Sequence, residues 1–286
     1  MFRSSELVLG PDGSIYHLAL FPEEVAPTIL TVGDPDRVAK VSAHFDRIEV
    51  RRQKREFVTH TGEIGGKRLT VVSTGIGPDN IDIVLNELDA LFNIDLQTRT
   101  LRPEPQRLRI VRLGTSGSMR PDLAPGTFVA SSFGAGLDNL LSFYRPRFSP
   151  EETHIAQALA QTLPEVPAPY VVAGSESLLT AFSDWQQGIT ITCPGFYGPQ
   201  GRSLRAPSAV PDLPERLGEL QIGTHRVTNF EMETAAIYGL CRLLGHEGLS
   251  LSVILANRRL GAFADNPAAL EAELIRQALE RVISDK

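Results

Sequence analysis

Three segments of this sequence repeat one pattern, in which a β-branched apolar run leads into a turn that contains glycine and then towards a helix. The three segments are residues 28–41, 68–88 and 108–118. Strands that alternate with helices in this way are typical of α/β proteins, whose sheets are covered by helices. The sequence therefore predicts an α/β fold with a central mixed β-sheet flanked by α-helices.

Later segments extend the same architecture. Residues 126–133, 169–177 and 250–258 have the composition of further strands. A helix packed on the sheet is predicted within 230–245, and its apolar stripe consists of Ile237, Leu240, Cys241 and Leu244. A closing helix is predicted over 267–284, with Asp265 and Asn266 as capping candidates and Pro267 in its first turn.

Two segments are rich in proline and glycine, residues 135–165 and 183–215. We expect them to be surface loops and lids. In open α/β sheets, ligands bind beyond the carboxyl ends of the strands, so the turns that follow the strands are the place to look for function.

Composition limits the classes of protein that this chain can belong to. Its 286 residues, of which 42% are hydrophobic, suffice for one large core, and no linker or repeat divides them, so residues 1–286 are predicted to be a single domain. No apolar run of about 18 residues is present, which favours a cytoplasmic location. A net charge of -6 argues against nucleic-acid and membrane partners. The two cysteines, Cys193 and Cys241, are expected to be reduced structural thiols.

The first polar turn contains the stretch GDPDRV. Gly33 ends a strand, Pro35 suits a helix start, and Arg37 falls in the first helical turn. This arrangement can present backbone N–H groups and a guanidinium to one anion. The alternative is an ordinary turn with a surface arginine.

A second polar turn follows a strand that contains a charge. Arg112 lies inside an otherwise apolar run, and Gly114 and Thr115 follow it. A buried arginine needs an anionic partner, which is either a bound anion or a carboxylate of the chain itself. The pattern alone leaves both open.

The run RRQKREF supplies a third cation, Arg55, although such a run is more often a solvated strand edge. The glycines of TGIGPDN lack the spacing of a dinucleotide-binding turn, so an NAD enzyme is not indicated.

Two carboxylates, Glu231 and Glu233, lie at the entrance of the predicted helix within 230–245. Residues two apart do not share a helix face, so different roles are expected. Glu231 is interpreted as structural, by capping the helix, and Glu233 as free to bind a sugar diol. Met232 would pack on an apolar face of the ligand.

At this point the sequence resembles the hexameric nucleoside phosphorylase family, and within it the uridine phosphorylases. The resemblance runs along most of the chain, in the family's order and approximate spacing. The matching stretches are YHLAL, TVGDPDRV, KREF, STGIG, VRLGTSGS, GFYGPQGRS, NFEMETA and ILANR.

The resemblance implies roles for particular residues. Phosphate, the co-substrate, would be bound by Gly33, Arg37, Arg112 and Thr115, and by Arg55 of a neighbouring subunit. The ribose would be bound by Glu233 and Met232, and by His17 of the neighbour. The enzyme is thus expected to be an assembly of dimers with shared active sites, a homohexamer built as a trimer of dimers, without an organic cofactor.

The stretch GFYGPQGRS implies the base. Phe196 would pack on a pyrimidine, while Gln200 and Arg202 would bind its polar edge. Gln offers a donor beside an acceptor, which matches O2 and N3–H of uracil, and Arg donates to O4. Purine-specific relatives carry an acidic residue after the late strand, where this chain has Asn257 and Arg258.

Two departures from the family pattern remain. Glu56 and Ile76 match members that bind a monovalent cation such as K⁺ between subunits, but Asn80 stands in place of a serine. The segment 93–108 is longer than usual and has no assigned role.

The resemblance therefore implies phosphorolysis of uridine to uracil and ribose 1-phosphate, a pentosyl transfer in pyrimidine salvage and catabolism. Arg37, Arg112, Gln200 and Arg202 would be the catalytic residues, because little beyond positioning and electrostatics is required. The alternatives are a nucleosidase or a purine nucleoside phosphorylase of the same fold, and a non-catalytic nucleoside-binding protein.

Overall fold

The computed structural model describes residues 1–284, which form two compact units. The first unit comprises Met1–Val111 and Leu240–Glu247, and the second comprises Arg112–Gly239 together with the chain from Gly248 onwards. Strands and helices alternate, and the strands pair in both directions, so the predicted α/β class with a mixed sheet flanked by helices is confirmed. That residues 1–286 are a single domain stays a prediction.

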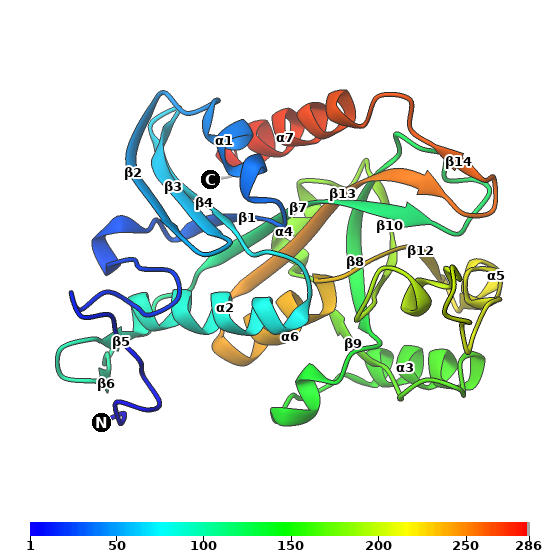
Figure 1. Cartoon of the computed structure of the whole chain (residues 1–286), viewed down its shortest axis with the longest axis horizontal. Helices are drawn as coiled ribbons and strands as arrows, with labels where there is room; N and C mark the ends of the chain where they lie inside the picture. The colour runs from blue at the N-terminus through cyan, green and yellow to red at the C-terminus, as the bar shows by residue number, and fades with distance from the viewer. Residues whose placement is uncertain (285–286) are drawn as a thin grey trace. The chain divides into compact units, whose positions relative to one another are not determined.

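In the first unit, four strands pair in the order β1-β4-β3-β2 (Figure 1). They are β1 (Thr28–Val32), β2 (Arg47–Lys54), β3 (Phe57–Ile64) and β4 (Lys67–Ser73). The strands β1 and β4 are parallel, and Val32 pairs with Ser73 at their carboxyl ends. The turns that follow these two strands therefore leave the sheet at the same edge.

The helices of the first unit begin at those turns. They are α1 (Pro35–Ser42) and α2 (Pro78–Asn93), after a short 3-10 helix η1 (Pro22–Glu24). Each of the two α-helices has proline in its first turn, where the missing N–H has no intrahelical partner to lose. The side chain of Asp34 accepts a hydrogen bond from the N–H of Asp36 and so caps α1.

The segment 93–108, which had no predicted role, continues from α2 into a small hairpin. It contains β5 (Ile94–Asp95) and β6 (Thr100–Leu101). The carbonyl of Arg99 accepts from the N–H of Phe2, and the Arg99 guanidinium donates to the carbonyl of Leu7. The insertion thus holds the N-terminal segment of the chain.

In the second unit, the strand order is β11-β12-β10-β8-β13-β7, and β12 also pairs with β7. The principal strands therefore close into a ring (Figure 1). The strands of this unit are β7 (Arg109–Ser118), β8 (Phe128–Gly136), β9 (Tyr170–Ala173), β10 (Gln186–Thr192), β11 (Gln221–Ile222), β12 (His225–Glu231), β13 (Glu247–Asn257) and β14 (Ala262–Phe263).

Strand β10 is parallel to both of its neighbours, β8 and β12. The carboxyl ends of these three strands therefore lie together, as the α/β pattern requires for a ligand site. The helices of this unit are α3 (Pro150–Thr162), α4 (Glu176–Thr180), α5 (Leu213–Glu219) and α7 (Pro267–Ser284), with the 3-10 helices η2 (Leu140–Phe143) and η3 (Gly198–Gln200); α6 (Thr234–Leu244) belongs to it up to Gly239. The predicted closing helix agrees with α7, and Asn266 caps it by accepting from the N–H of Ala269.

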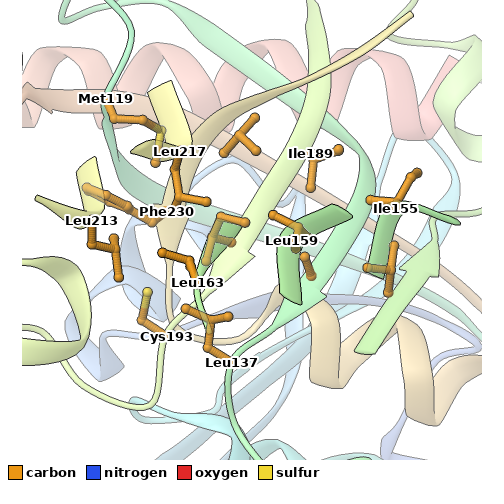
Figure 2. Close-up of a cluster of buried hydrophobic side chains, with 14 of the residues drawn as sticks. Met119, Leu137, Ile155, Leu159, Leu163, Ile189, Cys193, Leu213, Leu217 and Phe230 are labelled. Atoms are coloured by element: carbon orange, nitrogen blue, oxygen red, sulfur yellow. The ribbon is translucent and has the colours of Figure 1, made fainter. Parts of the chain in front are cut away.

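A buried apolar cluster joins the strands of the second unit to its helices (Figure 2). Ile155 and Leu159 of α3 and Leu213 and Leu217 of α5 pack against side chains from β8, β10 and β12, among them Phe230. This apolar burial supplies the main stabilisation of the framework that carries the carboxyl-end loops.

The expectation that 135–165 and 183–215 are loops and lids was wrong in part. The first range contains α3, and the second contains the central strand β10 and the helix start of α5. A capping box marks α3 in the sequence, in which Ser149 and Glu152 satisfy each other's backbone N–H groups. Strand β10 was hidden by its threonines, whose hydroxyls are buried but hydrogen-bonded, as in Thr190 with Asn229.

Both cysteines are free and buried, as predicted. Burial raises the pKa of each thiol, so Cys193 and Cys241 stay protonated and unreactive. Among the described residues, no helix is long and apolar enough to cross a membrane.

Candidate active site

The charged centre of the second unit is a buried arginine between two glutamates. The Nη2 atom of Arg112 is 2.5 Å from Oε2 of Glu233 and 3.1 Å from Oε2 of Glu231. The three side chains are exposed by 7% or less, so solvent screens their attraction little. Burial alone would lower the pKa of Arg112, but the two carboxylates outweigh it and the pKa is raised. The guanidinium is therefore always charged.

One nitrogen of that guanidinium takes no part in the ion pairs. Within residues 1–284, the buried Nη1 atom of Arg112 has no hydrogen-bond partner. A buried charged donor without a partner costs free energy, and such donors in native proteins mark a ligand or a solvent molecule. Of the two alternatives for Arg112, the pairing with carboxylates of the chain is present, and the binding of an anion by the remaining N–H groups stays a prediction.

Gly114 explains part of the motif around Arg112. A β-carbon on Gly114 would lie 1.8 Å from Nη1 of Arg112, far inside van der Waals contact. Glycine is therefore needed two residues after the arginine, on the same face of β7, so that the guanidinium can fold over the strand. Thr115, on the other face, is half-buried.

Glu231 has the structural role predicted for it, in addition to its pairing with Arg112. Glu231 accepts hydrogen bonds from the backbone N–H groups of Glu233 and Thr234 and from the hydroxyl of Thr192, so it caps helix α6. Both glutamates pair with Arg112, and Glu233 accepts a hydrogen bond from its Nη2 atom at 2.5 Å. Met232 between them is half-buried. The diol role of Glu233 and the packing role of Met232 stay predictions.

The glycine-rich loop 195–203 carries a second polar cluster. Nη1 of Arg202 donates to Oε1 of Gln200 and to the carbonyl of Phe196, both at 2.6 Å. The guanidinium also lies over the Phe196 ring, 3.8 Å from its centre. Gln200 is buried, whereas the Phe196 side chain is 51% exposed. The three predicted base-binding residues therefore form one cluster.

Arg258 holds this loop in place. In the sequence it stood out only because purine-specific relatives carry an acidic residue in this region. Its guanidinium donates to the carbonyls of Gln200 and Gly201 at 3.0 and 3.3 Å. Burial, and then the positive charge of Arg258, lower the pKa of Arg202. Asn257 is structural, because its amide donates to the carbonyls of Arg120 and Leu123.

The first unit holds the other predicted phosphate residues. A β-carbon on Gly33 would lie 3.5 Å from the carbonyl oxygen of Gly75, so the two turns that follow β1 and β4 run side by side. Arg37 is buried in the first turn of α1, where its N–H donates to the carbonyl of Asp34. The predicted strand-turn-helix geometry around Arg37 is confirmed, and its role in binding phosphate stays a prediction.

Arg55 occupies the two-residue turn of the hairpin β2–β3 (Figure 1). Its side chain is exposed, and within residues 1–284 it has no hydrogen bond or ion pair. Its φ angle is 54°, which costs a residue with a side chain about 1–3 kcal/mol. Folding alone therefore gives arginine no advantage over glycine at this position.

His17 is held by a residue that sequence reasoning missed, Glu87 of α2. Nδ1 of His17 is 2.6 Å from Oε1 of Glu87, and the carboxylate also accepts from the N–H groups of His17 and Leu18. No local signal in the sequence could have paired positions 70 apart.

Comparison with known proteins places this set of residues in a family. The model of the phosphorylase superfamily matches residues 27–284. The chain belongs to the phosphorylase superfamily.

Members of this superfamily resemble the chain over nearly its full length. It is 29% identical to a uridine phosphorylase of Thermococcus kodakarensis, over 99% of this chain and 92% of that protein. It is 26% identical to the uridine phosphorylase of Escherichia coli, over 85% and 86% of the two chains. A solved nucleoside phosphorylase of Trypanosoma brucei, described as having uridine phosphorylase activity, superimposes with a TM-score of 0.90 at 28% identity, over 98% of this chain and 100% of that one.

The possible cation residues of this superfamily member lie in the first unit. A β-carbon on Gly75 would be 2.4 Å from the Asn80 amide and 3.2 Å from Cγ of Glu56, so these side chains approach the same turn. Ile76, between them in sequence, has a side chain that is 68% exposed. The described residues contain no cluster of three or more His, Cys, Asp or Glu side chains that could hold a metal ion. A monovalent cation there stays a prediction.

A buried acid-phenol pair at the carboxyl end of β8 was not predicted. The hydroxyl of Tyr170 is 3.0 and 2.9 Å from the two carboxylate oxygens of Asp138, and Leu140 donates its N–H to the same group. Burial raises the pKa of Asp138, partly opposed by these hydrogen bonds. Gly136 makes room for the pair, because a β-carbon there would lie 2.6 Å from the Tyr170 hydroxyl.

Proposed function

We propose that this protein is a uridine phosphorylase, a pentosyltransferase that converts uridine and phosphate to uracil and ribose 1-phosphate. The observation that carries the proposal is the cluster of Phe196, Gln200 and Arg202, an aromatic face beside a polar pair. Its support from relatives is the uridine phosphorylase activity named for the proteins of Thermococcus, Escherichia and Trypanosoma.

The polar pair suits uracil because of how its hydrogen bonds are used. Oε1 of Gln200 accepts from Arg202 and keeps a second lone pair, which N3–H of uracil can use, while the amide N–H₂ can donate to O2. Arg202 has further N–H groups for O4. Cytosine reverses the donor and acceptor at N3 and C4, so it would place acceptor against acceptor.

The proposed chemistry needs one bond formed and one broken. A phosphate oxygen forms a bond to C1′ of the ribose while the bond from C1′ to N1 breaks, its electron pair passes to N1 of uracil, and the proton that hydrogen phosphate loses ends on that nitrogen. The transition state has oxocarbenium character, like that of glycoside cleavage. Gln200 and Arg202 stabilise the departing base by donating hydrogen bonds to its oxygens.

The phosphate would be bound by Gly33, Arg37, Arg112 and Thr115, with Arg55 of the partner subunit. The unpartnered Nη1 of Arg112 supports its part in this set. The ribose hydroxyls would be bound by Glu233, with Met232 on the sugar and the partner subunit's His17 on the 5′-hydroxyl. A hexamer of shared-site dimers, a cytoplasmic location, a role in pyrimidine salvage and a monovalent cation at Glu56, Ile76 and Asn80 belong to the same proposal, and they rest on the resemblance and the sequence.

The deciding experiment is a product assay on a panel of nucleosides, with and without phosphate. Uridine is expected to disappear only with phosphate present, and to give uracil and ribose 1-phosphate. Release of free ribose without phosphate would identify a nucleosidase. Preference for inosine or adenosine would identify a purine enzyme, and binding without turnover would identify a nucleoside-binding protein.

The shared site has its own test. Arg55→Ala and Arg112→Ala should each be inactive alone, and mixing them under conditions of subunit exchange should restore activity. Half of the randomly formed dimers are mixed, and each mixed dimer has one intact site of two, so activity should return to about a quarter of the wild-type level. If mass measurement proves exchange and no activity returns, Arg55 acts within its own chain.

A further inference from the structure

The carboxylate of Glu87 binds the short loop that contains His17 and Leu18. It accepts from the backbone N–H of His17 with both oxygens, each at 3.0 Å, and from the N–H of Leu18 at 2.9 Å. It also lies 2.6 Å from Nδ1 of the His17 ring. One side chain thus fixes both the backbone and the imidazole of His17.

The backbone of this loop has a conformation that costs free energy, which the contacts with Glu87 offset. Ala19 has a φ angle of 53°, a left-handed conformation that costs a residue with a β-carbon about 1–3 kcal/mol. Lys54 adds a second tether, because its ammonium donates to the carbonyl of Tyr16 and lies 4.5 Å from the centre of the Tyr16 ring. Glu87 and Lys54, which belong to other elements, thus tether the loop at two points.

The contact with Glu87 also decides which ring nitrogen of His17 is left for a ligand. An ionised carboxylate can only accept hydrogen bonds, so in the neutral ring Nδ1 carries the proton and Nε2 is an acceptor. Within residues 1–284, Nε2 of His17 has no hydrogen bond, and the side chain is 29% exposed. Nε2 is thus an oriented acceptor for a donor from outside this chain.

We propose that Glu87 is a positioning residue for recognition of the ribose 5′-hydroxyl: by holding Nδ1–H of His17, it presents Nε2 to accept the proton of that hydroxyl. The inference rests on the proposed function, because it takes His17 as the residue that contacts the 5′-hydroxyl. Glu87 itself touches no substrate, so its effect must depend both on His17 and on the presence of the hydroxyl.

The test compares uridine with 5′-deoxyuridine in wild type and Glu87→Gln. Glutamine keeps the size and can still accept from the two backbone N–H groups, but its N–H₂ then faces Nδ1 and moves the ring proton to Nε2. We expect kcat/KM for uridine to fall about tenfold, which corresponds to about 1.4 kcal/mol, and that for 5′-deoxyuridine to change less than about twofold. In a His17→Ala background, Glu87→Gln should have no further effect on either substrate.

A matched control exists on the same helix. Asp89 also lies beside an imidazole, since its Oδ1 is 3.2 Å from Nε2 of the buried His246, although the two atoms lack hydrogen-bond geometry. Asp89→Asn removes one negative charge from α2 just as Glu87→Gln does. It should leave the ratio of the two kcat/KM values unchanged. Equal losses on both substrates in Glu87→Gln, or none on either, would overturn the proposal.

A second measurement does not depend on activity. Long-range ¹H–¹⁵N spectra of protein labelled at histidine, with His17→Ala to assign the signal, report which ring nitrogen is protonated. The wild type should show Nδ1–H at neutral ring charge, and Glu87→Gln should show Nε2–H. An unchanged tautomer would reject the positioning role. If the tautomer changes between wild type and Glu87→Gln as expected but the wild type does not cleave uridine, the proposed function is rejected instead.

Discussion

Arg112 and Arg55 are expected to bind the same phosphate, but the protein holds them in opposite ways. Arg112 is buried in a strand, paired with two glutamates and packed over a glycine. Arg55 is exposed at the tip of a hairpin, in a strained backbone conformation and without a partner among residues 1–284. Arg112 is part of the buried core of its unit, whereas Arg55 lies on the surface of its unit.

This difference teaches that a binding role and a structural role need not coincide. Removal of Arg112 takes the guanidinium away from two buried carboxylates, so folding and function should fail together. Removal of Arg55 leaves nothing unpaired in this chain. Variants at the two positions should therefore separate stability from activity.

The largest effect is expected from Arg112→Ala. The free energy of unfolding should fall by about 3–5 kcal/mol, because the buried carboxylates of Glu231 and Glu233 lose the guanidinium that lies between them. The kcat/KM for uridine should fall at least about 100-fold, as when a donor to developing charge is lost. Denaturant unfolding and steady-state kinetics measure the two quantities. A stable variant would show that the pairing with the glutamates contributes little to the fold.

Arg55→Gly should separate activity from stability most clearly, in contrast to Arg112→Ala. Activity should be lost to a similar extent, while the free energy of unfolding should rise by up to about 1 kcal/mol, because glycine adopts a positive φ without steric cost. The control is Arg52→Ala on the same hairpin, which removes an exposed ion pair with Glu24. It should preserve activity. A destabilised Arg55→Gly protein would mean that Arg55 supports its own hairpin.

Smaller losses are expected in the base loop. Gln200→Ala and Arg202→Ala should each reduce transition-state stabilisation for uridine by about 1–3 kcal/mol, and thermal unfolding should change little. The matched control is Arg205→Ala, an exposed arginine three residues further on. Wild-type kinetics in both loop variants would remove the assignment of the base.

The smallest effect concerns pH and the buried Asp138. Burial raises the pKa of its carboxyl, so the folded protein binds that proton more tightly than the unfolded chain does. The carboxyl therefore lowers stability as pH rises from its ordinary pKa of about 3.9 through its raised value. Asp138→Asn removes this dependence and should gain stability relative to wild type as pH rises above about 4. Parallel stability curves for the two proteins across this range would contradict it.

Much of the fold could be predicted from local pattern. The closing helix α7 and the turn before α1 were found from their caps and prolines, because capping is a local interaction between neighbouring residues. The helix α3 carried the same kind of signal in its capping box and was overlooked within a loop-like composition. The strand β10 could not be found so easily, because the partners of its buried threonines come from other strands.

The sequence by itself determined the family to which this protein belongs. Arg112, Glu233, Gln200 and Arg202 stand in motifs whose order identifies the phosphorylase superfamily, because local spacing sets which groups share a turn. Only the tertiary structure decided how those groups are held. Arg112 meets Glu233 from 121 positions away, Arg258 reaches Gln200 from 58, and Glu87 reaches His17 from 70. No periodicity links residues so distant, since their contact depends on how the strands and helices pack.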